Sequence, residues 1–190
     1  VEMQFANSGL AGNSGLLMYN ETQEVGQEQL FSTLLGTSIS GTPVQLIPVP
    51  HDVTSWKCWS EMNTETTVIA ANEQYKKRYR KGDPKMYFLT DTIYYPADPM
   101  PSDGVNPKTL IIAFPTSTGH AVYSVSELAE AAGDSGKVQL TIDNELINVS
   151  VQQLPLSAIA RNEDGTIVSS QRALWFAWFG NHPSCVISSP

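Results

Sequence analysis

All four tryptophans of the chain lie in two copies of one short motif. Trp56 and Trp59 form the first pair, and Trp175 and Trp178 form the second. Residues at this spacing lie on one face of a helix, so both indoles of a pair point the same way. Because the indole ring is large and mainly apolar, such a pair is far more often a packing anchor than a catalytic device. We therefore predict two similar lobes, each ending in a short Trp-x-x-Trp helix whose indoles face inward.

The composition favours a mainly β protein outside the cytoplasm. Hydrophobic residues make up 41% of the 190 residues, which is enough for a sizeable core. Charged residues make up only 16%, below the roughly 25% of an average soluble domain. Short apolar runs alternate with turn residues along most of the chain, and this pattern is typical of strands. We predict a mainly β (α+β) fold in a secreted protein, either extracellular or periplasmic.

A Pro-rich segment divides the chain. Residues 96–107 contain four prolines, and proline-rich segments act as stiff spacers. We therefore predict a first β-rich lobe over residues 1–95, a linker over 96–107 and a second β-rich lobe over 108–190.

Local signals place several elements. Thr54 or Ser55 precedes the first tryptophan helix as a candidate cap, and Gly133 ends a predicted helix that begins near residue 125. Residues 143–144, Asp and Asn, separate two alternating segments and predict a tight hairpin.

The net charge of −8 and the pI of about 4.7 exclude a broad basic surface for nucleic acid. The local exception is a basic segment that holds five of the eleven basic residues. Its cations form a candidate ligand patch: Lys76, Lys77, Arg78, Arg80 and Lys81. One interpretation is a patch for an acidic polymer or an anionic surface. The other is a solvated strand edge, where cations discourage edge pairing. No apolar run approaches the ~20 residues of a membrane span.

The chain has two cysteines, Cys58 and Cys185, and each lies in a copy of the tryptophan motif. In an oxidising compartment they would pair and hold the two copies together. The alternative is two unrelated buried thiols. Neither cysteine has a CxxC partner, so a dithiol active site within this chain is excluded.

Two sequons, at Asn20 and Asn148, are candidate glycosylation sites in a secreted protein. Asn148 lies in a strand-like run, which makes it the less favoured of the two.

The sequence shows no catalytic or metal motif. His51, His120 and His182 are scattered and lack the spacing of a metal site, so we interpret each as structural. A composite site of His51, Cys58 and His182 is the alternative. No Gly-x-Ser-x-Gly turn or phosphate-binding glycine loop is present. We predict no metal and no cofactor.

An ordered set of residues resembles a family called domain of unknown function 3179. The matching residues include Leu16-Leu17-Met18-Tyr19, Leu34 with Gly36, Ile39 with Gly41, Leu46-Ile47-Pro48, Trp56-x-x-Trp59, Tyr75, Tyr79, Asp83-Pro84, Tyr87-Phe88, Ala121-Val122-Tyr123, Leu174-Trp175-Phe176-Ala177-Trp178 and His182-Pro183. The resemblance covers most of the chain and is weakest between residues 133 and 170. It implies an extracytoplasmic protein with no established activity.

Similar proteins usually carry a Cys-Pro-x-Cys segment before the part at which this chain begins, and no residue here matches it. Polar family positions also differ, at Asn20, at residues 31–33 and at residues 63–64. Two functional hypotheses follow. The first is a secreted, non-enzymatic module that binds or assembles through an uncovered strand edge, with a partner protein or a second copy. The second is an accessory domain of an extracytoplasmic thiol oxidoreductase whose CxxC segment lies outside this chain.

Overall fold

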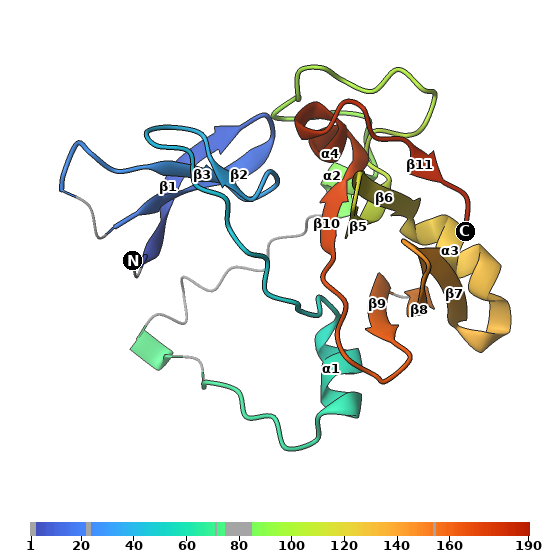
Figure 1. Ribbon diagram of the computed structural model, residues 1–190. Helices are drawn as coiled ribbons and strands as arrows, with labels where there is room; N and C mark the ends of the chain where they lie inside the picture. The colour runs from blue at the N-terminus through green and yellow to red at the C-terminus, as the bar shows by residue number, and fades with distance from the viewer. Residues whose placement is uncertain (1–2, 22–23, 71, 75–84, 154) are drawn as a thin grey trace. The chain divides into compact units, whose positions relative to one another are not determined.

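The computed structural model describes residues 3–21, 24–70, 72–74, 85–153 and 155–190 (Figure 1). The chain divides into two compact units. The main unit comprises residues 1–53 and 95–190, and the insert unit comprises residues 54–94.

This division differs from the predicted lobes 1–95 and 108–190, because the Pro-rich segment is not a spacer. Ala97 is buried, and Asp103 accepts a hydrogen bond from Trp175 Nε1 at 3.0 Å. These contacts hold residues 96–107 against the main unit, to which the segment belongs.

The N-terminal part of the main unit is an antiparallel sheet of order β1–β2–β3–β4. Its strands are β1 (Phe5–Gly12), β2 (Gly15–Asn20), β3 (Leu30–Ser32) and β4 (Thr37–Ser38). The turn between β1 and β2 uses Asn13 and Ser14 at positive φ, the geometry that matches the twist of a hairpin. Leu17 and Phe31 are the buried apolar side chains of this sheet.

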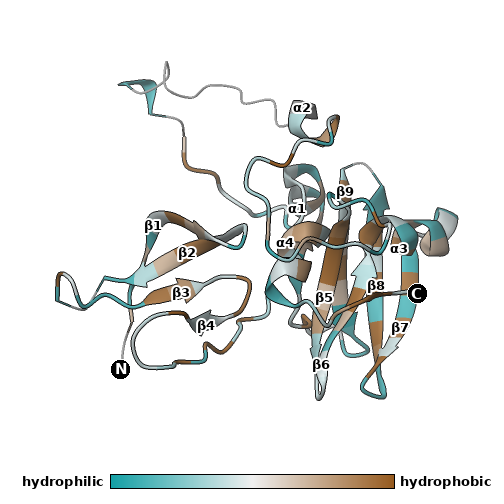
Figure 2. Cartoon of the chain, turned by 90° about the horizontal axis from the view of Figure 1, so that it is seen from above, coloured by the Kyte–Doolittle hydropathy of each residue, from teal (hydrophilic) through white to brown (hydrophobic). Residues whose placement is uncertain are grey.

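The rest of the main unit contains two further sheets. The four-stranded sheet has the order β10–β5–β6–β11, and the three-stranded sheet has the order β7–β8–β9. The strands are β5 (Leu110–Thr116), β6 (Gly119–Ser124), β7 (Lys137–Ile142), β8 (Glu145–Gln153), β9 (Leu156–Asn162), β10 (Gln171–Leu174) and β11 (Ile187–Ser188). The predicted hairpin forms at Asp143 and Asn144, both at positive φ. Alternating apolar and polar residues along β7 and β8 (Figure 2) give this sheet a buried inner face and a polar outer face.

Two helices of this region cover opposite faces of β5. Ile112 and Phe114 pack with α3 (Val125–Ala132) and the inner face of β7–β8–β9. Ile111 and Ala113 point the other way and pack with Trp175 and Trp178 of α4 (Trp175–Asn181). Ser124 caps α3, because its Oγ accepts a hydrogen bond from Glu127 N. Gly133 ends the helix and is the first residue of η2 (Gly133–Ser135). The helix predicted to begin near residue 125 and the helix predicted at the second tryptophan pair are both confirmed.

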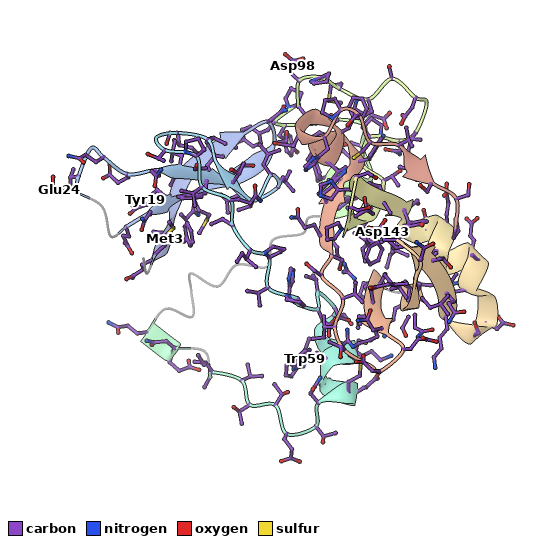
Figure 3. All side chains as sticks on the ribbon, in the orientation of Figure 1. Met3, Tyr19, Glu24, Trp59, Asp98 and Asp143 are labelled. Atoms are coloured by element: carbon purple, nitrogen blue, oxygen red, sulfur yellow. The ribbon has the colours of Figure 1, made fainter. Side chains whose placement is uncertain are left out.

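The insert unit contains α1 (Trp56–Met62) and α2 (Lys85–Phe88), and its described residues include no strand. Ser55 caps α1, because its Oγ accepts a hydrogen bond from Cys58 N at 3.1 Å. Trp56 is 57% exposed and Trp59 is 37% exposed. Trp59 (labelled in Figure 3) donates its Nε1 hydrogen to Thr66 Oγ1 at 2.9 Å instead of entering a core.

The structure therefore confirms the mainly β class and differs from the predicted duplication. Only the second tryptophan pair anchors a core, whereas the first lies on a helix whose buried residue is Cys58. No sheet among the described residues of the insert unit covers Trp56 and Trp59. In the part of the chain that the structure describes, no helix has the length and apolarity needed to cross a bilayer.

Candidate functional site

The structure does not gather the candidate site residues of the sequence into one site. The basic residues Lys76, Lys77, Arg78, Arg80 and Lys81 lie outside the described residues. Cys58 and Cys185 are both free thiols, as in the second of the two alternatives that the sequence left open. Asn20 is only 2% exposed, whereas Asn148 is exposed on β8. A glycan therefore has room at Asn148 and none at Asn20, which reverses the order expected from the sequence.

Two histidines and a tryptophan form a ring cluster at the end of α4. The imidazole of His182 stacks on Trp178, with ring centroids 4.2 Å apart and planes inclined by 29°. His120, on β6, contacts both rings edge to face, at 5.0 Å from Trp178 and 4.7 Å from His182. Trp178 itself is fully buried.

The polar atoms of this cluster serve the fold. A ring nitrogen of His182, Nε2, lies 3.2 Å from Leu34 O and so ties the end of α4 to the N-terminal sheet. The backbone N of Cys185 donates to His182 O at 3.0 Å. Trp178 Nε1 is buried without a hydrogen-bond partner.

His51 lies outside this cluster. It is exposed, and its Nδ1 lies 2.9 Å from Val49 O, so the structure pairs His182 with His120 rather than with His51. Among the described residues, no group of three or more His, Cys, Asp or Glu side chains is arranged to hold a metal ion.

The cluster makes stability depend on pH. Burial and, to a smaller extent, the charge of His182 lower the pKa of His120. The unfolded chain therefore binds a proton at this residue more readily than the folded chain, and stability falls as the pH drops below about 6.5. We expect His120→Phe, which keeps an aromatic ring but cannot titrate, to flatten this acid-side loss. Urea unfolding at several pH values between about 5 and 7.5 measures it. An unchanged slope in the variant would contradict this assignment.

Asn13 joins three distant parts of the main unit. Its Nδ2 donates to Asp98 O at 3.0 Å and also to Gly180 O, and its Oδ1 accepts from Asp98 N at 2.6 Å. Asn181 Nδ2 donates to Asn13 O at 3.0 Å. Beside this joint lies an apolar hollow of about 280 Å³ lined by Leu17, Leu35, Ile39 and neighbouring residues. The side-chain amides of Asn13 and Asn181 at its rim already make hydrogen bonds within the fold. These contacts hold the main unit together, so we do not assign a recognition site to this hollow.

Gly180 is required at this joint. A Cβ built on Gly180 would lie 2.5 Å from Ala97 Cβ, closer than two carbon atoms can approach. We expect Gly180→Ala to reduce the free energy of unfolding by about 1–3 kcal/mol, the usual cost of overpacking. In an Ala97→Gly background the same change should cost clearly less, because the atom that it meets is gone. Denaturant unfolding of the four proteins measures both, and equal costs in the two backgrounds would rule out this clash.

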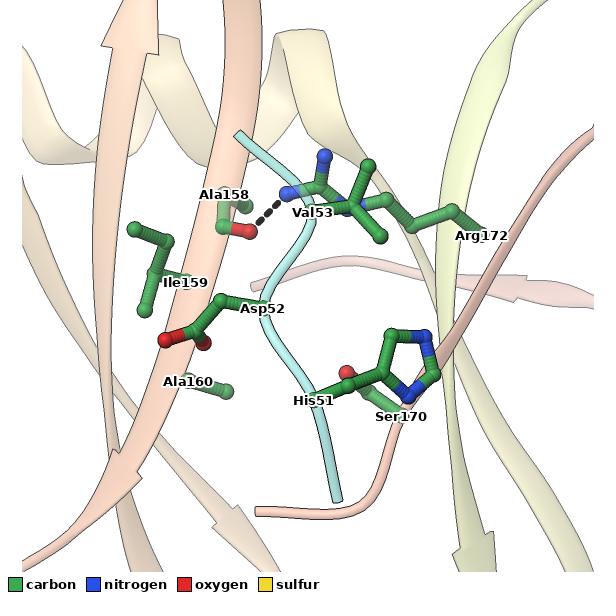
Figure 4. Close-up of a pocket in the computed structure, with 8 residues that line it drawn as sticks. All are labelled: His51, Asp52, Val53, Ala158, Ile159, Ala160, Ser170 and Arg172. Atoms are coloured by element: carbon green, nitrogen blue, oxygen red, sulfur yellow. Dashed lines mark hydrogen bonds between the residues drawn. The ribbon is translucent and has the colours of Figure 1, made fainter. Parts of the chain in front are cut away.

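A partly buried ion pair between Asp52 and Arg161 fixes the segment before the insert unit to β9. Arg161 Nη1 donates to Asp52 Oδ1 at 2.6 Å, and Nη2 donates to Asp52 Oδ2. Arg172 on β10 donates to Ala158 O and so links the two sheets (Figure 4). Burial lowers the pKa of Arg172, and the carboxylate of Asp52 acts in the opposite direction. The cavity among these groups holds about 10 Å³, so they leave no room for a ligand larger than a water molecule.

The outer face of β7–β8–β9 carries a much larger hollow, of about 540 Å³, which we call the outer-face hollow. It lies within the size range of ligand sites in proteins. The polar residues that line it are Lys137, Gln139, Asn148, Ser150, Arg161, Asn162 and Glu163. Gln139 Nε2 donates to Asn148 Oδ1 at 3.2 Å, and Asn148 stands opposite Arg161 on β9. Of these residues, only Asn148 is a candidate site residue from the sequence, because it belongs to a glycosylation sequon.

β1 is an edge strand whose only neighbour in the described sheet is β2. It carries no charged residue, which is unusual for an exposed edge. Its pairing shifts between Asn7 and Ala11, and within this bulge Leu10 N donates to Ser8 Oγ at 3.1 Å. Gly9 N donates to Asn7 Oδ1 at 2.8 Å. The bulge therefore uses some of the donors that a partner strand would need and shortens the free edge.

A family model described as Protein of unknown function (DUF3179) matches residues 1–185 of the chain. This match confirms the family resemblance. No curated protein and no solved structure matches the chain.

Proposed function

We propose that this chain, which belongs to the family of proteins of unknown function (DUF3179), is a non-enzymatic binding module of an extracytoplasmic compartment. The outer-face hollow is the observation that supports this function. The ammonium group of Lys137, the hydroxyl of Ser150 and the carboxylate of Glu163 make no hydrogen bond or ion pair with other described residues. A ligand can use these groups without breaking a contact of the fold, so their binding energy is available for recognition.

The other clusters of polar residues are used differently. His182 and Asn13 hold segments of the main unit together, and Asp52 neutralises Arg161. Replacing any of these contacts by a ligand would leave a buried group unpaired, which is costly. The outer-face hollow is therefore the surface at which binding and folding do not compete.

Backbone amide shifts test the proposal. We expect mixtures of small polar compounds to include one that shifts the amide resonances of β7, β8 and residues 162–165 in an ¹⁵N correlation spectrum. The double change Gln139→Ala and Asn148→Ala should remove these shifts. The matched change Thr141→Ala, at an exposed position of the same strand, should keep them. If sugars, peptides, nucleotides and organic acids all leave these amides unmoved, the chain is not a binding module of this kind.

Assembly through β1 is a second candidate, favoured by the absence of charge along that edge. Antiparallel addition of a second copy would pair residues 5–7 and 11–12 on either side of the bulge. Light scattering coupled to size exclusion should then show a dimer at high concentration. The variant Ala6→Lys, which places a charge on this edge, should be a monomer. A monomer at every concentration would exclude it.

A third candidate is the accessory domain of an extracytoplasmic thiol oxidoreductase, with its CxxC segment outside this chain. It is favoured by the two free thiols, because Cys185 is only partly buried. Iodoacetamide should then alkylate Cys185 in the native protein within minutes and leave Cys58, which is buried, unmodified. A native protein inert to iodoacetamide would exclude this role.

A further inference from the structure

We infer that the outer-face hollow binds a neutral, polyhydroxylated ligand, with a short saccharide chain as its chemical class. The inference rests on the proposed binding function and adds the kind of ligand. It follows from the arrangement, the charge and the polarity of the side chains that line the hollow.

The hairpin register arranges the polar groups in two rows. Gln139 stands opposite Asn148, and Lys137 stands opposite Ser150. Neighbours across the strands are about 5 Å apart at their Cβ atoms, and neighbours along one strand are about 7 Å apart. The hollow thus presents a compact array of hydrogen-bonding groups on a rigid sheet, which suits a ligand with many closely spaced polar atoms.

The charges within the hollow cancel. Lys137 contributes a positive charge and Glu163 a negative one, while the charge of Arg161 is neutralised by Asp52. The chain as a whole carries a net charge of −8. An anionic polymer would meet no net attraction in the hollow and repulsion from the rest of the chain. A cation would meet one carboxylate and one ammonium group. The ligand that fits this balance is neutral.

The lining offers little to an apolar ligand. Val138 and Val149 border the hollow through their strands, but they belong to the inner face, where Val149 is fully buried. No aromatic side chain lines the hollow among the described residues. A peptide would therefore find no pocket for an apolar side chain, and a nucleobase would find no ring to stack on.

The free groups match hydroxyls instead. Each hydroxyl of a sugar both donates and accepts, and so do the amides of Gln139 and Asn148 and the hydroxyl of Ser150. The bond from Gln139 Nε2 to Asn148 Oδ1 orients the two amides and leaves Asn148 Nδ2 and Gln139 Oε1 for the ligand. Without an aromatic platform the affinity will be weak, with a Kd of roughly 1 mM or somewhat below.

Titrations of ¹⁵N-labelled protein made in a host without N-glycosylation test the inference. The probes are maltotriose, cellotriose and chitotriose as neutral saccharides, trigalacturonate as an anionic one, and a capped neutral pentapeptide. We expect at least one neutral saccharide to shift the amides of residues 137–139, 148–150 and 162–165 with saturation at millimolar concentration. Gln139→Ala with Asn148→Ala should weaken binding at least tenfold, and Thr141→Ala should leave it unchanged.

The outcomes separate this inference from the proposed function. Shifts at the hollow with trigalacturonate or the peptide, and none with neutral saccharides, would overturn the ligand class and keep the binding function. No shift at these amides with any compound, including the broader mixtures, would overturn both. Saccharide binding that survives the double change would place it elsewhere and overturn the inference. A glycan attached at Asn148 would occupy the same hollow, so the glycosylated protein should not bind the saccharide.

Discussion

Replacing Trp178 by alanine should lower the free energy of unfolding by about 3–5 kcal/mol, whereas the same change at Trp59 should lower it by less than about 1 kcal/mol. Trp178 is fully buried between β5, β6 and the ring of His182, so its removal leaves a cavity in the core. Trp59 is partly exposed and contacts the hydroxyl of Thr66. Chemical denaturation followed by circular dichroism compares the two variants.

Trp178→Phe is the matched control for this prediction. The phenyl ring keeps much of the buried volume and removes the Nε1 hydrogen that has no partner. Its cost should therefore be clearly smaller than that of Trp178→Ala. Equal destabilisation by Trp59→Ala and Trp178→Ala would mean that the two tryptophan pairs are equivalent core anchors after all, and would restore the duplicated architecture.

The contrast between the two pairs shows what local patterns can predict. Both pairs form helices, as their spacing indicates, and Ser55 caps the first, because caps and helical faces depend on neighbouring residues. Whether a face is buried depends on what packs against it. Ile111 and Val122 cover Trp178, and they lie more than fifty positions before it in the chain. The spacing of residues around Trp59 predicts a helical face but does not indicate which distant residues, if they pack against it, would bury that face.

The Pro-rich segment differs from its predicted role as a spacer for the same reason. Its composition is that of a spacer, and composition describes stiffness rather than contacts. The hydrogen bond from Trp175 to Asp103 and the packing of Gly180 against Ala97 join residues more than seventy positions apart. Such pairs follow from the fold and cannot be recognised from a local segment.

Part of the outer-face hollow was accessible to sequence reasoning. The two-residue turn at Asp143 and Asn144 fixes the register of β7 and β8, so residues at equal distances from the turn face each other. This rule alone places Gln139 opposite Asn148 and Lys137 opposite Ser150, as the structure has them. The position of Arg161 beside them requires β9, and its pairing with Asp52 spans 109 residues. No pattern in the sequence indicates that pair.

Asp52→Asn should lower the free energy of unfolding by about 3 kcal/mol. The side chain of Asp52 is 7% exposed and that of Arg161 is 28% exposed. The change removes the negative charge but keeps the size of the side chain, so Arg161 is left without its counter-ion in a partly buried site. Arg172 also loses a favourable charge, because Asp52 opposes the effect of burial on its pKa. Urea unfolding measures the loss, with the exposed Asp134→Asn as a control that should leave stability unchanged.

The double change Asp52→Asn with Arg161→Gln separates the ion pair from packing. Once Arg161 is neutral, the loss of the carboxylate should cost much less, and the two changes should not add. Additive costs would mean that Asp52 stabilises the segment by packing alone.

The ion pair of Asp52 and Arg161 also sets the charge of the outer-face hollow, because Arg161 lines the hollow. In Asp52→Asn the guanidinium is no longer neutralised and the hollow becomes positive. This variant, unlike the original protein, should therefore bind trigalacturonate, and the effect should weaken as salt is added.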